Sequence, residues 1–178
     1  MLEKPGAAPE GYNTVSPWVV TDDTGAFLDF VGSAFDGEEL GRVATDDGLI
    51  GHGEIRVGDT VVLAFDRHVD WAAIPSLLRV FVADADAAVS RALAAGAQIV
   101  TPISDDAFGQ RGARLRDPFG NIWWVSCHVE DVTEDQMWER LQDPVYSERM
   151  RVAQATLDAE LSGRPVGRSS APVRNSSN

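Results

Sequence analysis

The sequence is poor in cysteine, in basic residues and in long apolar runs. Its 178 residues include one cysteine, Cys127, so no disulfide can form within the chain, and we expect a protein of the reducing cytoplasm. No apolar run approaches the roughly 20 residues that span a bilayer. The opening Met1–Glu10 is polar and lacks the apolar core of a secretion signal. The sequence therefore predicts a soluble, cytoplasmic protein.

Basic residues are outnumbered, because 15 Lys and Arg against 28 Asp and Glu give a formal net charge of −13. No basic stripe is present that could neutralise a phosphate backbone, so we expect no nucleic-acid partner. Anionic membrane surfaces are disfavoured for the same reason. The acidic excess either attracts a cationic small molecule or only keeps the protein in solution, and the sequence leaves both readings open.

Two stretches of the chain show the same order of predicted elements, β-α-β-β-β. In the first, Ser16–Val20 precedes an Asp-Asp-Thr-Gly break and apolar positions at helical spacing. Two strand-like runs then flank Gly58-Asp59, which is typical of a hairpin turn. In the second, Leu78–Val82 leads into a helix that ends at Gly96, and Asp117-Pro-Phe-Gly closes a last hairpin.

The two stretches align at an offset of 62 residues, which places Asp22 on Asp84 and the hairpin glycines on each other. Ordered matches with a shared element order predict an internal repeat. We therefore predict an α+β fold, in which two tandem βαβββ modules form a cupped mixed sheet and C-terminal helices follow. The predicted segments are a flexible N-terminus (1–12), the modules (13–67 and 77–130) with their connection (68–76), a helical extension (131–161) and a disordered tail (162–178).

The pattern beyond residue 130 is helical. Thr133 and Gln136 have the spacing of a capping box. Pro144 interrupts the helix, which can resume as far as Leu161. These helices either close a pocket or dock on a second subunit, and the sequence does not separate the two.

The second module carries the residues of a family resemblance. Val80-Phe-Val-Ala-Asp-Ala-Asp-Ala-Ala, and the Arg-rich strand that leads into Asp117-Pro-Phe-Gly-Asn-Ile-Trp-Trp, resemble the vicinal oxygen chelate superfamily. That family includes glyoxalase I, extradiol dioxygenases, fosfomycin-resistance enzymes and bleomycin-binding resistance proteins. The resemblance covers about Asn13 to Val129 and implies the duplicated fold, but no specific activity. It also implies a homodimer in which modules complete one another's cups.

The resemblance implies where a metal would be held, early in the first strand and midway along the last strand of each module. These positions fall on Ser16 and Leu78, and on Val62 and Trp124. Serine is a poor metal ligand, and the other three side chains have no atom to donate. We therefore expect no metal site and no other cofactor.

His52 and Glu54 are candidates for catalysis. They lie two residues apart on a predicted strand and so share a face, where an imidazole and a carboxylate can hold a metal or act as an acid/base pair. A two-residue loop at Gly58-Asp59 places both on the face opposite the family's ligand positions, whereas a bulged turn reverses this. The alternative is a polar sheet edge.

The predicted binding site is an apolar, aromatic cup with rim residues from the loop before the last hairpin. Its aromatic rings can stack on a flat ligand or on a cation, or they fill the sheet as core. Arg114 and Arg116 are predicted to point away from the cup, toward surface acids. The predicted ligand-binding residues are Ser16, Trp18, Val62, Ala64, Leu78, Val80, Phe108, Arg111, Trp124 and Ser126.

Two functions remain from this reading. The first is a metal-independent small-molecule-binding protein of the glyoxalase/bleomycin-resistance type, which sequesters an antibiotic or metabolite that is cationic or aromatic. The second is a lyase or isomerase on the same fold, which uses displaced metal ligands such as His52 and Glu54, or metal-free ring chemistry. The absent ligands, the aromatic cup and the acidic charge favour the first.

Overall fold

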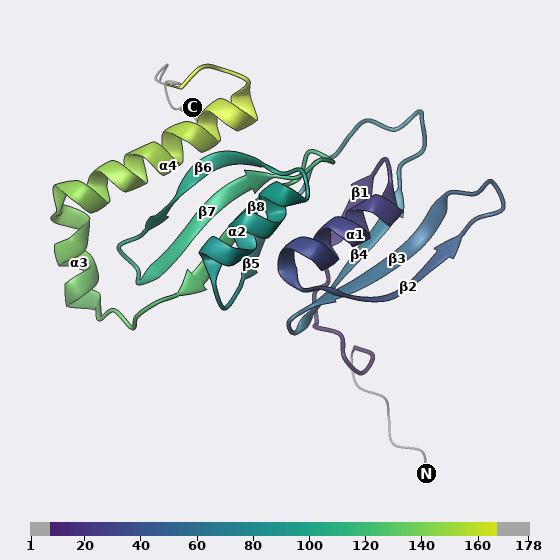
Figure 1. Ribbon diagram of the computed structural model, residues 1–178, viewed down its shortest axis with the longest axis horizontal. Coiled ribbons are helices and arrows are strands. Elements are labelled where there is room, and N and C mark those ends of the chain that lie inside the picture. The colour runs from purple at the N-terminus through teal and green to yellow at the C-terminus, as the bar shows by residue number, and fades with distance from the viewer. Residues whose placement is uncertain (1–7, 167–178) are drawn as a thin grey trace, which may run out of the picture.

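A computed structural model describes residues 8–166 and confirms the duplicated α+β fold. Each module is a four-stranded mixed sheet with one helix packed on one of its faces (Figure 1). Parts of the predicted flexible N-terminus (1–12) and disordered tail (162–178) lie outside the described residues. Among the described helices, none combines the length and the apolar character that crossing a bilayer requires.

The first module has the strand order β1-β4-β3-β2, with β1 parallel to β4 and the other neighbours antiparallel. Its helix begins because the Asp23 side chain accepts a hydrogen bond from the Ala26 amide at 2.9 Å, which satisfies a free donor of the first turn. The elements are β1 (Trp18–Thr21), α1 (Thr24–Phe35), β2 (Glu38–Ala44), β3 (Ile50–Val57) and β4 (Thr60–Asp66).

The second module repeats this arrangement with the strand order β5-β8-β7-β6. Asp84 caps its helix in the same way, accepting a hydrogen bond from the Ala87 amide at 3.0 Å. The elements are β5 (Leu77–Phe81), α2 (Ala85–Ala94), β6 (Gln98–Asp105), β7 (Gln110–Arg116) and β8 (Ile122–His128).

The two helix caps give the true offset of the repeat. Asp23 and Asp84 are 61 positions apart, so the predicted offset of 62, which aligned Asp22 with Asp84, is wrong by one residue. The sequence contains an Asp22-Asp23 doublet, and the alignment matched its first member instead of the one that caps the helix. Because side chains alternate along a strand, this single residue exchanges the two faces of a sheet.

The two final hairpins turn in different ways. The first closes over Gly58 and Asp59, with Gly58 at φ +58°, a left-handed conformation that glycine adopts without strain. The second is built around Asp117, which is 3% exposed. Its carboxylate accepts hydrogen bonds at 2.8–2.9 Å from the amides of Phe119 and Asn121, the Asn121 side chain and the Trp123 indole.

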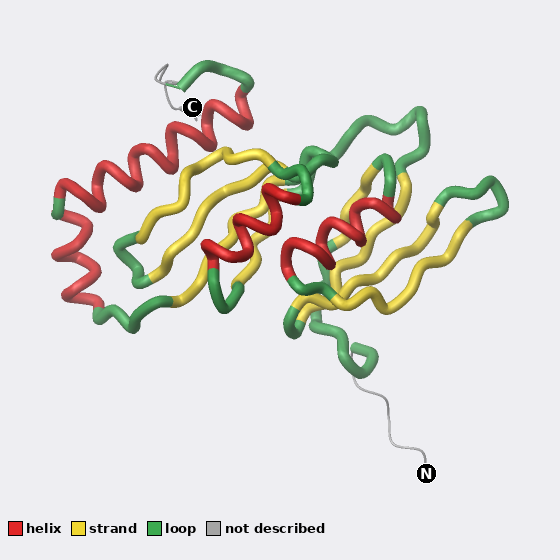
Figure 2. The backbone as a smooth tube through the Cα atoms, viewed as in Figure 1, coloured by secondary structure: helices red, strands yellow, loops and turns green. Residues whose placement is uncertain are grey.

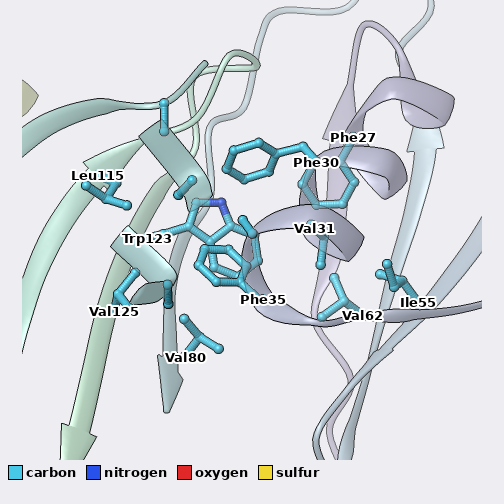
Figure 3. Packing of buried hydrophobic residues seen from close by; sticks show 14 of the residues in the cluster. Phe27, Phe30, Val31, Phe35, Ile55, Val62, Val80, Leu115, Trp123 and Val125 are labelled. Carbon is cyan, nitrogen blue, oxygen red and sulfur yellow. The ribbon is translucent and has the colours of Figure 1, made fainter. Parts of the chain in front are cut away.

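One apolar core joins the two modules. Helices α1 and α2 pack against each other, and each covers one face of its own sheet. Figure 3 shows the Trp123 indole of β8 among the phenylalanines of α1, and its ring centroid lies 4.7 Å from that of Phe35 and 6.4 Å from that of Phe27. Trp123 and Phe27 are almost fully buried, so the helix of the first module is held by a strand of the second.

The C-terminal extension consists of α3 (Glu134–Gln142) and α4 (Pro144–Ser162). The predicted capping box of Thr133 and Gln136 is confirmed. Helix α4 runs alongside the edge strand β6 of its own chain (Figures 1 and 2). The Thr156 and Thr101 hydroxyls meet at 2.7 Å, and Glu160 pairs with Arg116 at 2.9 Å. The extension therefore docks on the second module.

Candidate ligand-binding site

Each sheet has an inner face, which α1 and α2 cover, and an outer face directed away from these helices. Pairing between strands assigns residues to each face, because directly opposed residues point to the same side. In the first sheet, Val19 lies beside Ala64 and Val62 beside Ile55, all buried in the core around α1. These positions form its inner face.

Four predicted binding residues lie on the inner faces, which the helices cover, and not on the outer faces. Val62 and Ala64 point inward in the first sheet, and Leu78 and Val80 point inward in the second, where they pair with Trp123 and Val125. The error has a physical reason, since Val61, Val62, Leu63 and Ala64 are all buried, and a strand buried on both sides shows no alternation.

Three other predicted residues, Trp18, Trp124 and Ser126, do lie on outer faces. Trp18 opposes Leu63 across β1 and β4, and Leu63 opposes Glu54 across β4 and β3. The corresponding row of the second sheet is Arg79, Trp124 and Arg114. We call these three-residue sets the first row and the second row.

His52 and Glu54 lie on the first outer face beside Trp18, opposite Val62 and Ala64, as the two-residue loop predicts. The hairpin has the predicted pairing, but the face assigned to the cup was the inner one. The His52 Nε2 atom is 2.7 Å from Glu54 Oε1, and the rings of His52 and Trp18 lie 5.5 Å apart. Tyr12 donates its hydroxyl to Glu54 Oε2 at 2.6 Å.

These hydrogen bonds set the charge of the cluster. The bond from Tyr12, and then the bond from His52, lower the pKa of the Glu54 carboxyl, because they stabilise its ionised form. The same contact with Glu54 raises the pKa of Tyr12. The ionised Glu54 carboxylate therefore orients the His52 imidazole through its Nε2 atom.

A cavity of about 360 Å³ opens at one end of the first outer face. Trp18 packs edge-on against Phe65 at 5.4 Å, and Phe65 packs edge-on against Trp71 at 6.1 Å. Asp47 and His68 also line this cavity. This cavity is aromatic and partly acidic.

The second outer face has the opposite chemistry. The guanidinium carbons of Arg79 and Arg114 lie 4.2 and 4.4 Å from the centroid of the Trp124 ring, from strands on either side of β8. Arg114 was predicted to point toward surface acids, and this is wrong. Its burial, and then the nearby charge of Arg79, lower the pKa of Arg114. Arg116 shares this outer face and pairs with Glu160 of α4.

Helix α4 covers this face and encloses a cavity of about 360 Å³. The helix presents Arg149, Ala153, Thr156 and Glu160, which recur at helical spacing, to the sheet. Arg114 donates to the Ala153 carbonyl at 2.6 Å, and Arg149 donates to the Asp105 carbonyl at 3.2 Å. The remaining walls include Trp124, Phe108, Tyr146 and Met150. We call this space the α4 cavity.

The remaining predicted residues have mixed positions. Phe108 lines the α4 cavity and is 46% exposed, which fits its predicted place at the rim. Arg111 pairs with Asp86 at 2.7 Å and with Asp105 at 3.0 Å, so its charge is already compensated. Ser16 is half-buried just before β1. The prediction missed Arg79 and the residues of α4, although the helical stripe of α4 was a usable signal.

The positions that the resemblance assigns to metal ligands do not fit a metal. Val62 and Leu78 point into the inner face, and Trp124 has no donor atom for a cation. Within residues 8–166, no three His, Cys, Asp or Glu side chains are grouped as a metal ion would require.

Comparison with known proteins agrees with this fold. A family model described as Glyoxalase/Bleomycin resistance protein/Dioxygenase superfamily matches residues 12–125, which ends before α3 and α4. The uncharacterized protein Mb0911c of Mycobacterium bovis is 36% identical over 134 residues, 69% of this chain and 88% of that protein.

Two solved structures have a similar fold. TioX from Micromonospora sp. ML1 is 24% identical, with a TM-score of 0.56 over 66% of this chain and 99% of its own. The fosfomycin resistance protein FosX from Listeria monocytogenes is 11% identical, with a TM-score of 0.52 over 70% of this chain and 97% of its own.

Proposed function

The chain belongs to the Glyoxalase/Bleomycin resistance protein/Dioxygenase superfamily, and we propose that it is a metal-independent binder of a small organic molecule, which it sequesters in the α4 cavity. One observation carries this proposal. A cavity of about 360 Å³ lies between an aromatic sheet face and a helix outside the family match, a volume in the range of small-molecule sites.

The lining of the α4 cavity supports binding over a filled core. Trp124 is only partly buried and faces the space between the sheet and α4. Its fully buried neighbour Trp123 fills the core on the other face. The module therefore has one tryptophan that packs in the core and one that borders the cavity.

Cavity filling tests the proposal. The dye N-phenyl-1-naphthylamine, a neutral aromatic molecule, fluoresces when it enters an apolar site, and titration gives its Kd. Ala153→Leu places a larger side chain in the cavity, and we expect it to weaken dye binding at least about tenfold. Ala155→Leu on the same helix, outside the cavity lining, is the matched control. Equal binding by the wild type and both variants contradicts the proposal.

Metal independence has its own test. We expect dye binding to be unchanged after dialysis against a chelator, because the family's ligand positions hold no donor set. Stoichiometric metal in the purified protein, together with loss of dye binding after chelation, would overturn this part of the proposal.

A second candidate function is favoured by the geometry of Tyr12, Glu54 and His52. An imidazole oriented by a fixed carboxylate, beside an aromatic cavity, is suited to proton transfer in a lyase or isomerase reaction. Proton NMR with adducts of α-ketoaldehydes and thiols tests it. Turnover that is lost in His52→Gln and retained in His68→Gln supports this function, and turnover unchanged in both excludes a role for His52.

We also propose a homodimer, on the basis of an exposed apolar edge. Leu77 and Phe81 of the edge strand β5 are 62% and 60% exposed, and Trp18 of the edge strand β1 is 48% exposed. Light scattering should give twice the chain mass of 19.2 kDa. A monomeric mass over the micromolar range contradicts this proposal.

A further inference from the structure

We infer that the ligand of the α4 cavity is an organic oxyanion, a carboxylate, sulfonate or phosphate carried on a flat apolar body, and that Arg79 and Arg114 bind its charged group. This inference rests on the proposed function and adds the class of ligand. It is carried by two arginines on one tryptophan whose charges no acid of the described residues compensates.

Arg114 is the more informative of the two. It is 9% exposed, and its hydrogen bonds run from Nη1 alone, to the Ala153 carbonyl at 2.6 Å and to the Thr101 hydroxyl at 3.4 Å. Its Nε atom is buried without a hydrogen-bond partner. Burying one N–H of a guanidinium without a hydrogen-bond partner, and the charge without a counter-ion, is costly. An oxyanion supplies both a hydrogen-bond acceptor and a counter-ion for Arg114.

Arg79 brings a second positive charge to the same ring. It is exposed, donates to the Gln110 side chain, and forms no ion pair with any described acid. Most other arginines of residues 8–166 do form ion pairs, including Arg111 and Arg116 on β7. Two uncompensated cations at one tryptophan repel each other, so an anion that binds near both is stabilised by both.

The acids that line the α4 cavity do not pair with Arg79 or Arg114. Asp105 accepts from Arg111 at 3.0 Å and lies 3.7 Å from Arg149. Asp106 accepts from the backbone amides of Phe108 and Gln110 at 2.8 and 3.0 Å. Both carboxylates are held by partners other than Arg79 and Arg114, so the positive charge remains on the floor of the cavity.

The apolar part of the ligand follows from the other walls. Phe108, Tyr146 and Met150 surround the space next to Trp124, so they provide contact area for an aromatic or alicyclic body. The overall net charge of −13 opposes an anion only at long range. Screening reduces this repulsion beyond about 8 Å at physiological salt, whereas contacts within the cavity are screened much less.

A matched pair of dyes tests the class of ligand. The dye 8-anilinonaphthalene-1-sulfonate has the ring skeleton of N-phenyl-1-naphthylamine and one added sulfonate. At roughly 150 mM salt, we expect the sulfonate to bind the wild type about tenfold more tightly than the neutral dye. Arg79→Gln should weaken the sulfonate about tenfold and change the neutral dye less than about twofold. Arg114→Gln should weaken the sulfonate more than the neutral dye, because it also alters the hydrogen bond that holds α4 over the cavity.

Arg56→Gln is the matched control, because it removes one positive charge from the first module, where Arg56 donates to the Gly11 carbonyl. It should leave both dyes unchanged. Arg79→Gln keeps the test decisive if Arg114→Gln fails to fold, since Arg79 is exposed.

The outcomes separate the two proposals. If both dyes bind equally well to the wild type, or if the arginine variants weaken both dyes equally, the oxyanion inference is wrong while binding in the cavity stands. If neither dye binds, or if Ala153→Leu leaves both unchanged, the proposed function fails and the inference fails with it.

Discussion

The first row and the second row occupy equivalent positions in two copies of one fold, yet they carry opposite charge. Glu54 of the first row opposes Leu63, and Arg114 of the second opposes Trp124. Trp18 at the other end of the first row corresponds to Arg79. Duplication has therefore kept the inner faces apolar in both modules while the outer faces have diverged.

The local charge of each cavity therefore depends on the outer face of its own module and not on the net charge of the whole chain. The net charge of −13 favoured a cationic ligand. The first cavity, with Trp18 and Asp47, suits that expectation, whereas the α4 cavity has Arg79 and Arg114 on its floor. Within residues 8–166, a helix covers the second outer face and none covers the first.

The largest expected difference between the modules is in their final turns. Asp117→Ala removes the acceptor of four hydrogen bonds, three of them buried, and we expect it to cost about 3 kcal/mol or more in the free energy of unfolding. Asp59→Ala in the exposed turn of the first module should stay within about 0.5 kcal/mol. Urea unfolding measures both, and similar losses would show that the turns are equivalent.

The attachment of α4 provides the next contrast. Arg114→Ala removes a charged donor to the Ala153 carbonyl, so we expect a loss of about 2 kcal/mol and faster hydrogen exchange throughout α4. Arg56→Ala, on the first outer face, should leave exchange in α4 unchanged. If the α4 amides remain protected in Arg114→Ala, the helix is held by its other contacts and Arg114 is not its anchor.

The acid of the first row should make stability depend on pH. Glu54 has a pKa below its ordinary value of 4.5, because Tyr12 and His52 bond to its ionised form. Its contribution is therefore fully present above pH 4.5 and is lost as pH falls through the lowered pKa. Glu54→Gln should cost about 1 kcal/mol at neutral pH and less in acid.

Urea unfolding across this acidic range checks the sign. Glu38→Gln, at an exposed acid of β2, is the control. Its difference in stability from the wild type should not shrink as pH falls. A loss in Glu54→Gln that grows as pH falls would mean that the carboxylate is destabilising in the folded protein.

The fold was predictable from the sequence because its signals are local. Glycine turns, the capping box of Thr133 and Gln136 and the repeated element order each depend on neighbouring residues, and each is found in the structure. The two strand-like runs predicted around Gly58-Asp59 are the strands β3 and β4.

The candidate site was less predictable because a face depends on register. One residue of error in the repeat moved Val62 and Ala64 to the wrong side, and the uniformly buried run of β4 offered no alternation to correct it. The position of α4 depends on contacts far apart in the chain, such as Thr156 with Thr101, which no local pattern encodes.

The smallest effect is expected at the rim of the α4 interface, where Glu160 lies, in comparison with Arg114 at its centre. Glu160 pairs with Arg116 at 2.9 Å, but the Arg116 side chain is 44% exposed, so solvent and salt screen the pair. Glu160→Gln should cost less than about 0.5 kcal/mol at low salt and nothing measurable at high salt. Urea unfolding at two salt concentrations tests this. A loss as large as that of Arg114→Ala, unaffected by salt, would place the main attachment of α4 at its C-terminal end and move the closure of the second outer face away from Trp124.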